Sequence, residues 1–314
     1  TKMLNRFHVW FPGGLVIGGI LAWLLMDQLN ISWQVLTSLL IIPLALYGYL
    51  FFGQDIPETE RVSSGISYKE MLRNVAAPFT IIAVVFYMIL AASFPVLSMD
   101  FSSVLTYVVL VVIVIAVIVE GKLINKASLL FPFMLFCMFL TGSTELGTNQ
   151  WINALLENNG INPMIILVVV TGIMAVGRYF AGPLVHRLNP SGVLLGSAIF
   201  SFAGLYLLSI ADGAGFTMFA AIIFAIGVCY FWPTMLGFVS EYIPSSGALG
   251  LSVMGGAGMV ATSMVLPIMG ESIDTAGPQM TLRYMAILPG ILIALFIGLN
   301  LFMKGKKVNS PGTH

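Results

Sequence analysis

The residues best able to do chemistry lie in the segment TGSTELGTNQW. Thr141, Glu145 and Asn149 recur at every fourth position, so on a helix they share one face. Gln150 and Trp151 follow directly and flank that face. A carboxylate, two amides and an indole together suit a polyhydroxylated ligand, because they offer hydrogen bonds and a flat apolar surface for a sugar ring. These five residues are the candidate substrate-binding residues of the segment.

Glu145 is also an acidic residue embedded in a long apolar stretch. Ionisable groups inside a membrane segment are costly, so such a residue is by default a candidate for function. Desolvation favours the neutral carboxylic acid, which lets the group load and release a proton. Glu145 is therefore the candidate proton-coupling residue. In the alternative interpretation it lies solvated at the outer interface and serves only folding.

A second group of candidates stands before a proline. Tyr230 and Trp232 precede Pro233, which removes a backbone hydrogen bond and predicts a kink. Two aromatics that can form hydrogen bonds beside a kink suit a gate or the wall of a binding site. They also suit a packing gap or the interfacial belt, and the sequence leaves these alternatives open. His8, isolated near the start of the chain, is predicted as a capped or packed residue rather than a proton relay.

Two arginines and one glutamate are candidates for a cytoplasmic gate. Arg178 ends one apolar run, and Arg187 lies in the short segment after it. An arginine at such a place can hold the C-terminal carbonyls of a helix or a carboxylate of a neighbouring helix. Glu241, which follows a later run on the same side, is a candidate partner. In the alternative interpretation the arginines only mark the topology.

These residues must be positioned by helices that cross a membrane. The chain of 314 residues is 59% hydrophobic and 8% charged, which excludes a water-soluble fold. A helix needs roughly 20 mostly apolar residues to span the hydrocarbon, and its backbone must be satisfied within the segment. The sequence therefore predicts an all-α polytopic transmembrane helix bundle. Its ten uncharged apolar runs are Phe7–Met26, Gln28–Gln54, Asn74–Met99, Phe101–Val119, Ala127–Thr144, Asn158–Gly177, Leu188–Ala211, Gly213–Ser240, Tyr242–Gly270 and Tyr284–Met303.

Lysine and arginine are segregated along these runs. If the N-terminus is cytoplasmic and the runs alternate, every Lys and Arg except Arg283 falls on the inner side. The positive-inside rule then places both ends of the chain in the cytoplasm. The longest polar stretch, 54–74, becomes a cytoplasmic connector, in which S-Y-K-E at Ser67–Glu70 predicts a capping box before a short surface helix. No loop is basic and aromatic enough to indicate nucleic-acid binding.

Small residues in the run Tyr242–Gly270 predict close helix packing. Gly255, Gly258 and Thr262 lie on one stripe of that helix, and small residues at this spacing let backbones approach. Ser252, Gly256 and Ser263 form the neighbouring stripe. Packing is the better interpretation of both stripes, because glycine offers no chemistry to a substrate.

No residue pattern in the sequence indicates a cofactor or an enzyme. Cys137 and Cys229 lie inside apolar runs and resemble small buried residues rather than a disulfide framework. Three histidines are too few for a metal cluster, and no spacing suggests one. Without a P-loop, primary active transport is disfavoured. Paired carboxylates and a nucleophile elbow are lacking too, so we predict neither an enzyme nor a cofactor.

Three stretches resemble transporters of the major facilitator superfamily. LNRFHVWFPGGLVIGGIL resembles the fifth helix of many members, and GRYFAGPLVHRL resembles the loop between their eighth and ninth helices. TELGTNQWI is similar to the seventh helix of the fucose–proton symporter-like branch. The resemblance implies a secondary transporter of the bacterial inner membrane with alternating access, carrying a sugar-like solute with protons between two halves. His186 departs from the pattern, because an acidic residue usually stands there, and this weakens the standard charge latch.

The resemblance also divides the chain. It implies that helices one to four of an N-terminal half are missing partners of this chain, which is then expected to be incompetent for transport alone.

The alternatives to a symporter are an exporter of drugs or amphipathic metabolites and a membrane solute sensor that does not transport. The implied parts are 1–53, the last two helices of that half; 54–74, the connector; 75–126, an inserted helix pair; 127–304, a six-helix C-terminal half; and 305–314, a cytoplasmic tail.

Overall fold

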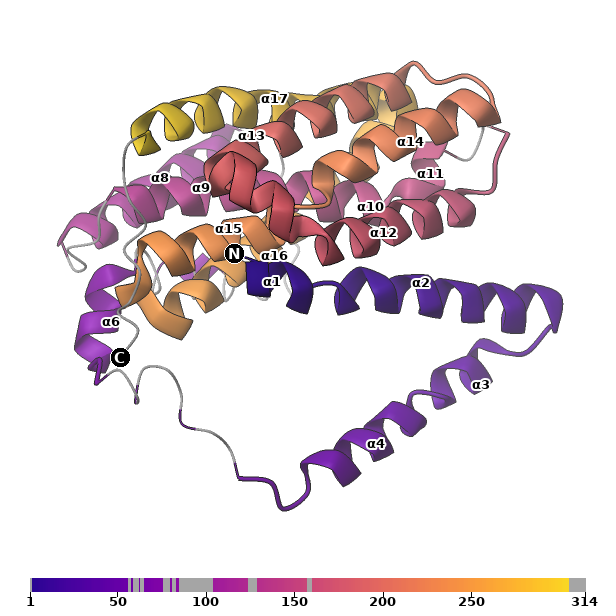
Figure 1. Ribbon diagram of the computed structural model, residues 1–314. Coiled ribbons are helices and arrows are strands. Elements are labelled where there is room, and N and C mark those ends of the chain that lie inside the picture. The colour runs from indigo at the N-terminus through magenta and orange to yellow at the C-terminus, as the bar shows by residue number, and fades with distance from the viewer. Residues whose placement is uncertain are drawn as a thin grey trace.

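The computed structural model is built from helices. It describes residues 2–55, 58, 62, 65–75, 80, 83–84, 104–123, 129–156 and 160–304. Within these ranges every regular element is a helix, and the long helices lie side by side in a bundle (Figure 1). The predicted all-α architecture is therefore confirmed for the described part of the chain.

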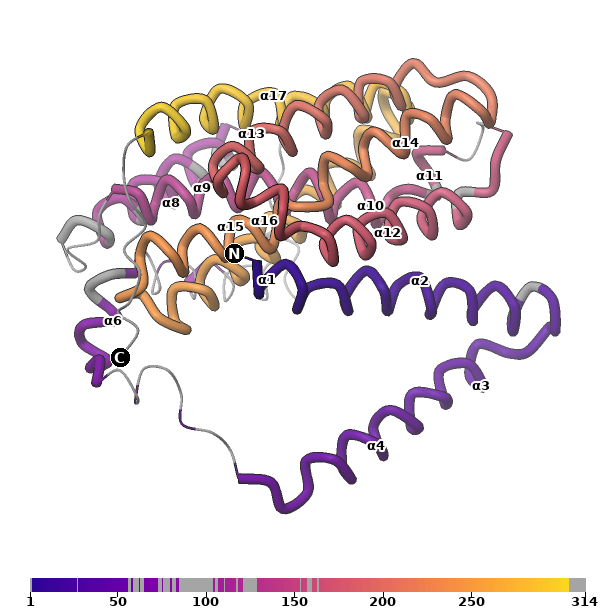
Figure 2. Tube along the Cα trace, viewed as in Figure 1, coloured from indigo at the N-terminus to yellow at the C-terminus, as the bar shows by residue number. Residues whose placement is uncertain are grey.

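The first apolar run forms an interrupted helix that lies along the bundle. α1 spans Lys2–Phe7, α2 spans Trp10–Ala22, and a π-helical stretch, η1, covers Trp23–Gln28. α2 packs against α12 (Pro163–Tyr179), and a Cβ on Gly19 would lie 3.4 Å from Val168 in that helix. The tube in Figure 2 shows the same neighbourhood, with α2 running beside α12.

The second arm of this hairpin extends away from the bundle. It consists of α3 (Trp33–Ser38) and α4 (Ile41–Phe51), and neither helix has a buried residue. Figure 1 shows α3 and α4 diverging from α2 below the bundle. Their apolar side chains are thus presented outward on all sides, as a helix in lipid permits.

Two helices with described bounds lie in the middle of the chain. α6 spans Tyr68–Asn74, and α8 spans Val104–Leu123 and contacts α9. The backbone N–H of Glu70 donates to Ser67 Oγ at 3.2 Å, so the predicted N-cap of α6 is confirmed. Nearly all of the predicted run Asn74–Met99 lies outside the described residues.

The later runs form the rest of the bundle. Asn162 caps α12 by accepting from Met164 N at 2.8 Å, with Pro163 at the first helical position, where a missing N–H costs nothing. The remaining helices are α9 Leu130–Gly142, η3 Ser143–Gly147, α10 Thr148–Gln150, α11 Ile152–Leu156, α13 Ala181–Ser209, α14 Ala214–Val228, α15 Phe231–Tyr242, η4 Pro244–Ser246, α16 Gly247–Ala276 and α17 Pro278–Met303.

Prolines mark the breaks in these helices. The chain leaves the helix at Cys229 and Tyr230, between α14 and α15, so the kink predicted from Pro233 is confirmed. Inside α13 the backbone is non-helical at Asn189, with φ 59° and ψ 163°, directly before Pro190. Asparagine tolerates positive φ, and a residue before proline avoids the helical region, so the sequence explains this second break as well.

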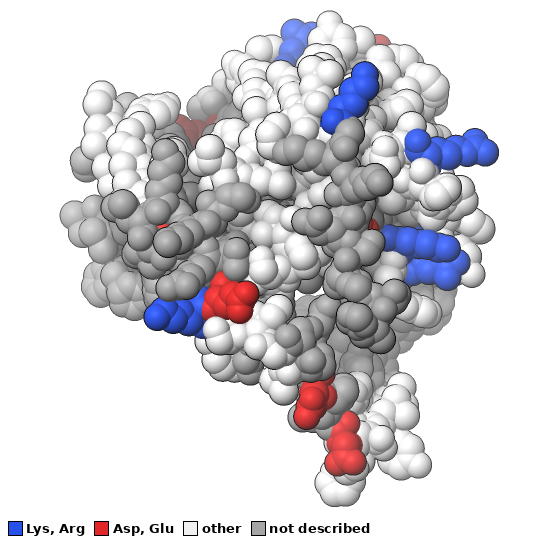
Figure 3. Space-filling view, turned by 60° about the vertical axis from the view of Figure 1, so that its left-hand side comes forward, with Lys and Arg blue, Asp and Glu red and all other residues white. Residues whose placement is uncertain are grey.

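Seven helical stretches are long and apolar enough to cross a membrane. Shorter apolar helices cover Tyr107–Glu120 and Met164–Tyr179. In Figure 3 most of the described atoms on this face are uncharged, and the Lys, Arg, Asp and Glu side chains stand in a few separate places. By length and composition the described chain is a multi-pass bundle. The seven stretches are Lys2–Met26, Trp33–Phe51, Leu130–Gln150, Ala181–Ser209, Ala214–Tyr242, Pro244–Ala276 and Pro278–Met303.

Glycines permit the crossing of α9 and α16. A Cβ on Gly142 would lie 2.8 Å from the carbonyl oxygen of Gly258, and one on Gly258 would lie 2.7 Å from the Trp232 ring. Thr262, on the same stripe as Gly258, is buried, whereas Gly255 faces open space. The packing predicted from the small residues therefore holds for the part of the stripe that faces α9 and α15.

We expect Gly142→Leu to destabilise the protein by about 1–3 kcal/mol, because a side chain cannot fit at a backbone crossing. Gly255→Leu is the matched control, since a Cβ there meets nothing within 4 Å. Thermal unfolding in detergent measures both. Equal losses for the two variants would contradict the crossing.

Candidate functional site

Glu145 and Arg178 form a buried ion pair between two helices. Arg178 Nη2 lies 2.9 Å from Glu145 Oε1, and the side chains are only 1% and 2% exposed. Arg178 belongs to the last turn of α12, and Glu145 belongs to the π-helical stretch η3. Pairing with an opposite charge is what an embedded ionised group requires. The solvated interfacial position considered from the sequence does not fit this burial.

Arg178 has two further partners, both of them backbone carbonyls. Nε donates to the carbonyl oxygen of Cys229 at 2.7 Å, and Nη1 donates to that of His8 at 3.3 Å. Cys229 is the C-cap of α14, and His8 lies at the break between α1 and α2. The arginine thus has both kinds of partner considered from the sequence, and it connects α12 to three other segments.

Two prolines explain why these carbonyls lack the usual donor from within their own helix. In an α-helix the carbonyl of one residue accepts from the N–H four residues later, and proline has no N–H. Pro12 stands four residues after His8, and Pro233 stands four residues after Cys229. Each proline removes the usual donor, and Arg178 supplies a donor to both carbonyls. Sequence reasoning missed these two contacts, although the proline spacing was a signal for them.

The π-helical stretch that carries Glu145 is fixed against α16. Gly142 lies at the crossing with Gly258, and a Cβ on Gly147 would lie 2.8 Å from Val265 Cγ1. A π-helical turn holds an extra residue and pairs its backbone less regularly than an α-helix, and such turns are frequent at functional sites. The sequence alone predicts one continuous helix here, because glycine and threonine give no distinct π-helical signal.

The Glu145 carboxyl also lies beside α15. The backbone N–H of Trp232 is directed at the carboxyl, and Oε2 has no hydrogen bond of standard geometry among the described residues. The Trp232 ring covers Gly258. The structure therefore places Trp232, named from the sequence, in the same cluster as Glu145.

Tyr230 joins this cluster from the break between α14 and α15. Its hydroxyl donates to the carbonyl of Gly177 at 3.1 Å, and Cys229 Sγ donates to that of Met174 at 3.6 Å. Both acceptors lie in the last turns of α12, directly before Arg178. Tyr230 is thus close to the ion pair, with its hydroxyl bonded to the backbone.

Thr141 and Trp151 have different neighbours. The Thr141 hydroxyl donates to the Met138 carbonyl at 3.0 Å, within its own helix. The Trp151 indole donates to the carbonyl of Leu266 in α16 at 3.0 Å, and its ring lies against Gly270. The proposed sugar-stacking surface is therefore packed on α16 in this structure.

The remaining candidates lie outside the ion pair. Asn149 is half-buried and Gln150 is exposed. Arg187 is exposed before the break in α13, and Glu241 is half-buried near the end of α15. The carboxylate partner of Arg178 is Glu145 rather than Glu241. The sequence could not show this, because it does not give the depth at which neighbouring helices meet.

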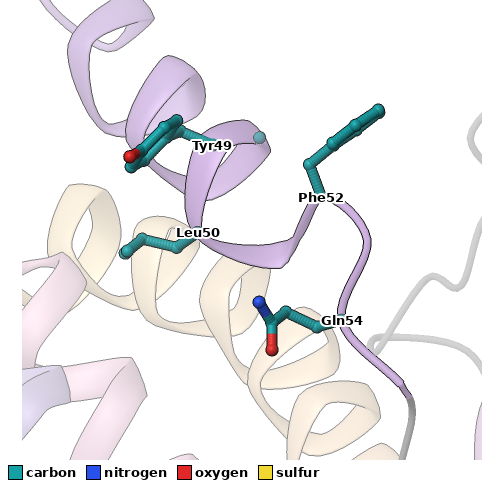
Figure 4. Close-up of a pocket in the computed structure, with 5 residues that line it drawn as sticks. Tyr49, Leu50, Phe52 and Gln54 are labelled. Carbon is teal, nitrogen blue, oxygen red and sulfur yellow. The ribbon is translucent and has the colours of Figure 1, made fainter.

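Two surface hollows lie apart from these residues. One, of about 330 Å³, is an apolar groove between α9 and α17, lined by Leu129, Leu130, Phe133, Ala294, Leu295, Gly298, Leu299 and Phe302. In the other, Tyr49 and Phe52 extend to opposite sides of the ribbon (Figure 4). That hollow measures about 490 Å³, lies at the end of α4, and is lined by Gly48, Tyr49, Leu50, Phe52 and Gln54.

No family model matches the sequence, and no curated protein or solved structure matches it. The class of protein therefore follows from the apolar helices of this chain. It is a helical, multi-pass membrane protein. Inside its bundle lies one arginine that holds a carboxylate and two carbonyls freed by prolines.

Proposed function

We propose that this protein is a secondary active transporter that moves a small, sugar-like solute together with protons by alternating access. The observation that carries the proposal is the buried pair of Glu145 and Arg178. Desolvating two charges costs several kcal/mol per ion, and apolar residues can often replace such a pair without loss of stability. A charged pair retained inside an apolar membrane bundle therefore favours a role in moving ions or solutes.

Glu145 is the proposed proton carrier. A proton can bind to Oε2, which has no partner among the described residues, while Oε1 faces Arg178. The carboxylate then becomes a neutral carboxylic acid, and its attraction to the guanidinium weakens. Arg178 stays bound to the carbonyls of His8 and Cys229. Proton uptake thus loosens η3 from α12 without freeing the arginine.

The other titratable groups near the pair support this assignment. They are the thiol of Cys229, the phenol of Tyr230 and the imidazole of His8, whose Nδ1 is hydrogen-bonded to the Leu4 carbonyl at 2.8 Å. A thiol and a phenol ordinarily hold their protons near neutral pH, so they exchange none there. The Nδ1 atom of His8 is engaged by the Leu4 carbonyl. Glu145 faces Arg178 directly, so its protonation is the one that changes the attraction between η3 and α12.

The resemblance to the major facilitator superfamily supports the same proposal. In this interpretation the ten apolar runs are ten membrane spans, α1–α4 belong to one half of the transporter, and α9–α17 form the other. Solute binding falls to the cluster around Glu145, with Tyr230 and Trp232 and with Thr141, Asn149, Gln150 and Trp151 of the same segment. Arg178, Arg187 and Glu241 remain the proposed gate of the cytoplasmic side, in a bacterial inner membrane.

An exporter of amphipathic compounds is the second candidate function. The apolar groove between α9 and α17 favours it, because such a groove suits an apolar ligand. Uptake of labelled sugars into vesicles from cells that express the full-length protein, with and without an imposed proton gradient, separates the two functions. Gradient-dependent uptake supports the symporter, efflux of apolar dyes supports the exporter, and binding without movement supports a sensor.

The proposed topology is tested by cysteine labelling from outside intact cells. We expect Asp274→Cys to react with an impermeant thiol reagent and His186→Cys to react only after the membrane is opened, because basic residues mark the cytoplasmic side. Both positions are exposed, and Cys137 and Cys229 are buried, so the wild-type protein gives the background. The reverse labelling pattern would invert the topology.

A further inference from the structure

Two buried threonines differ from the other described threonines. Thr148 and Thr234 are 0% exposed, yet their hydroxyls have no hydrogen-bond partner among the described residues. An unpaired buried hydroxyl is destabilising, so each one requires an explanation. Thr80 bonds to Glu120. Eight further threonine hydroxyls donate to a carbonyl three or four residues earlier, at Thr37, Thr141, Thr144, Thr171, Thr217, Thr262, Thr275 and Thr281. Ser197 and Ser201 in α13 are also buried without a partner among the described residues.

Both threonines belong to the segments that surround the Glu145 carboxyl. Thr148 and Asn149 belong to α10, which directly follows the π-helical stretch that carries Glu145. Asn149 Oδ1 is also buried without a partner, as is Glu145 Oε2. Thr234 stands two residues after Trp232, whose backbone lies beside the carboxyl. Unpaired oxygens thus lie on both segments that meet at the proton-binding group.

We propose that Thr148, Asn149 and Thr234 line an aqueous path to Glu145 that is closed in this structure and opens when η3–α10 and α15 separate. The path serves water that carries the proton: a hydronium ion gives one proton to Oε2, leaving water and a neutral carboxylic acid, and the reverse step restores the carboxylate. A threonine hydroxyl can donate and accept, so it can bond to such water in either direction. This inference rests on the proposed role of Glu145.

Cysteine accessibility tests the path directly. Thr148→Cys and Thr234→Cys should each react with a small hydrophilic thiol reagent about tenfold faster than Thr144→Cys. Thr144 is the matched control, because it is 0% exposed, lies one turn before Thr148, and donates to the Leu140 carbonyl at 2.8 Å. A rate as slow as that of the control at either position overturns the proposal. Labelling needs no transport, so it can succeed even where the proton-coupling role of Glu145 fails.

Valine substitutions give a second, independent test. Thr148→Val and Thr234→Val keep the shape and break no hydrogen bond among the described residues, so thermal stability should stay equal or rise. Proton-driven accumulation should nevertheless fall about tenfold. Thr144→Val should leave accumulation unchanged while losing its bond to Leu140. Unchanged accumulation in the first two variants would overturn the path, and lower stability with unchanged accumulation would show that the hydroxyls are structural.

Discussion

Glu145→Gln is expected to abolish uphill accumulation of the solute while leaving counterflow exchange intact. Glutamine keeps the size and the hydrogen bond to Arg178, but it cannot take up a proton. Uphill movement requires a proton with each solute, whereas exchange of solute for solute does not. Both assays use the same vesicles, so the ratio of accumulation to counterflow isolates the coupling step.

Two other outcomes of this substitution are informative. A loss of affinity in both assays would make Glu145 a ligand of the solute rather than the proton carrier. Unchanged results in both assays would make it a structural residue, and the proposed site would be abandoned. The control is Glu271→Gln, because Glu271 is exposed at the far end of α16 and should not alter coupling.

Arg178→Gln is expected to destabilise the protein by about 3–5 kcal/mol. The substitution leaves the Glu145 carboxylate buried without an opposite charge and weakens the bonds to the carbonyls of His8 and Cys229. Unfolding in detergent, followed by circular dichroism, measures the loss. The loss should shrink as the pH falls, because a protonated Glu145 needs no positive partner.

The double variant separates the ion pair from the other contacts of Arg178. Glu145→Gln combined with Arg178→Gln should recover much of the lost stability, because no unpaired charge remains. Arg283→Gln is the matched control, since Arg283 is exposed and its change should cost no more than about 0.5 kcal/mol. A loss for Arg178→Gln as small as that of Arg283→Gln would show that the pair does not stabilise the folded state.

The helices were predictable because the membrane imposes their length. Nine of the ten apolar runs coincide with helices of the described chain, and the tenth lies almost entirely outside it. The cap at Ser67 and the kink before Pro233 followed from local chemistry alone. The break at Asn189 was missed, although a polar residue before Pro190 was a signal for it. The π-helical stretch at Glu145 has no such local signal in the sequence. In the structure it packs closely against α16, and the sequence does not show that contact.

The site was predictable residue by residue but not as an arrangement. Glu145 and Arg178 each stood out as a charge near an apolar run, yet 33 residues separate them in the chain. Periodicity shows which residues share a face, but it does not show which face meets which helix. Trp151 illustrates this limit, because it shares a segment with Glu145 and yet packs on α16.

Proton movement that follows the addition of solute tests the central claim most directly. Vesicles that contain the full-length protein are placed in weakly buffered medium without a proton gradient, a transported sugar is added, and the pH of the medium is recorded. The account predicts that the medium becomes more alkaline as solute and protons enter together, and that Glu145→Gln removes this change while counterflow persists. Solute entry without any pH change in the wild-type protein would contradict proton-coupled transport.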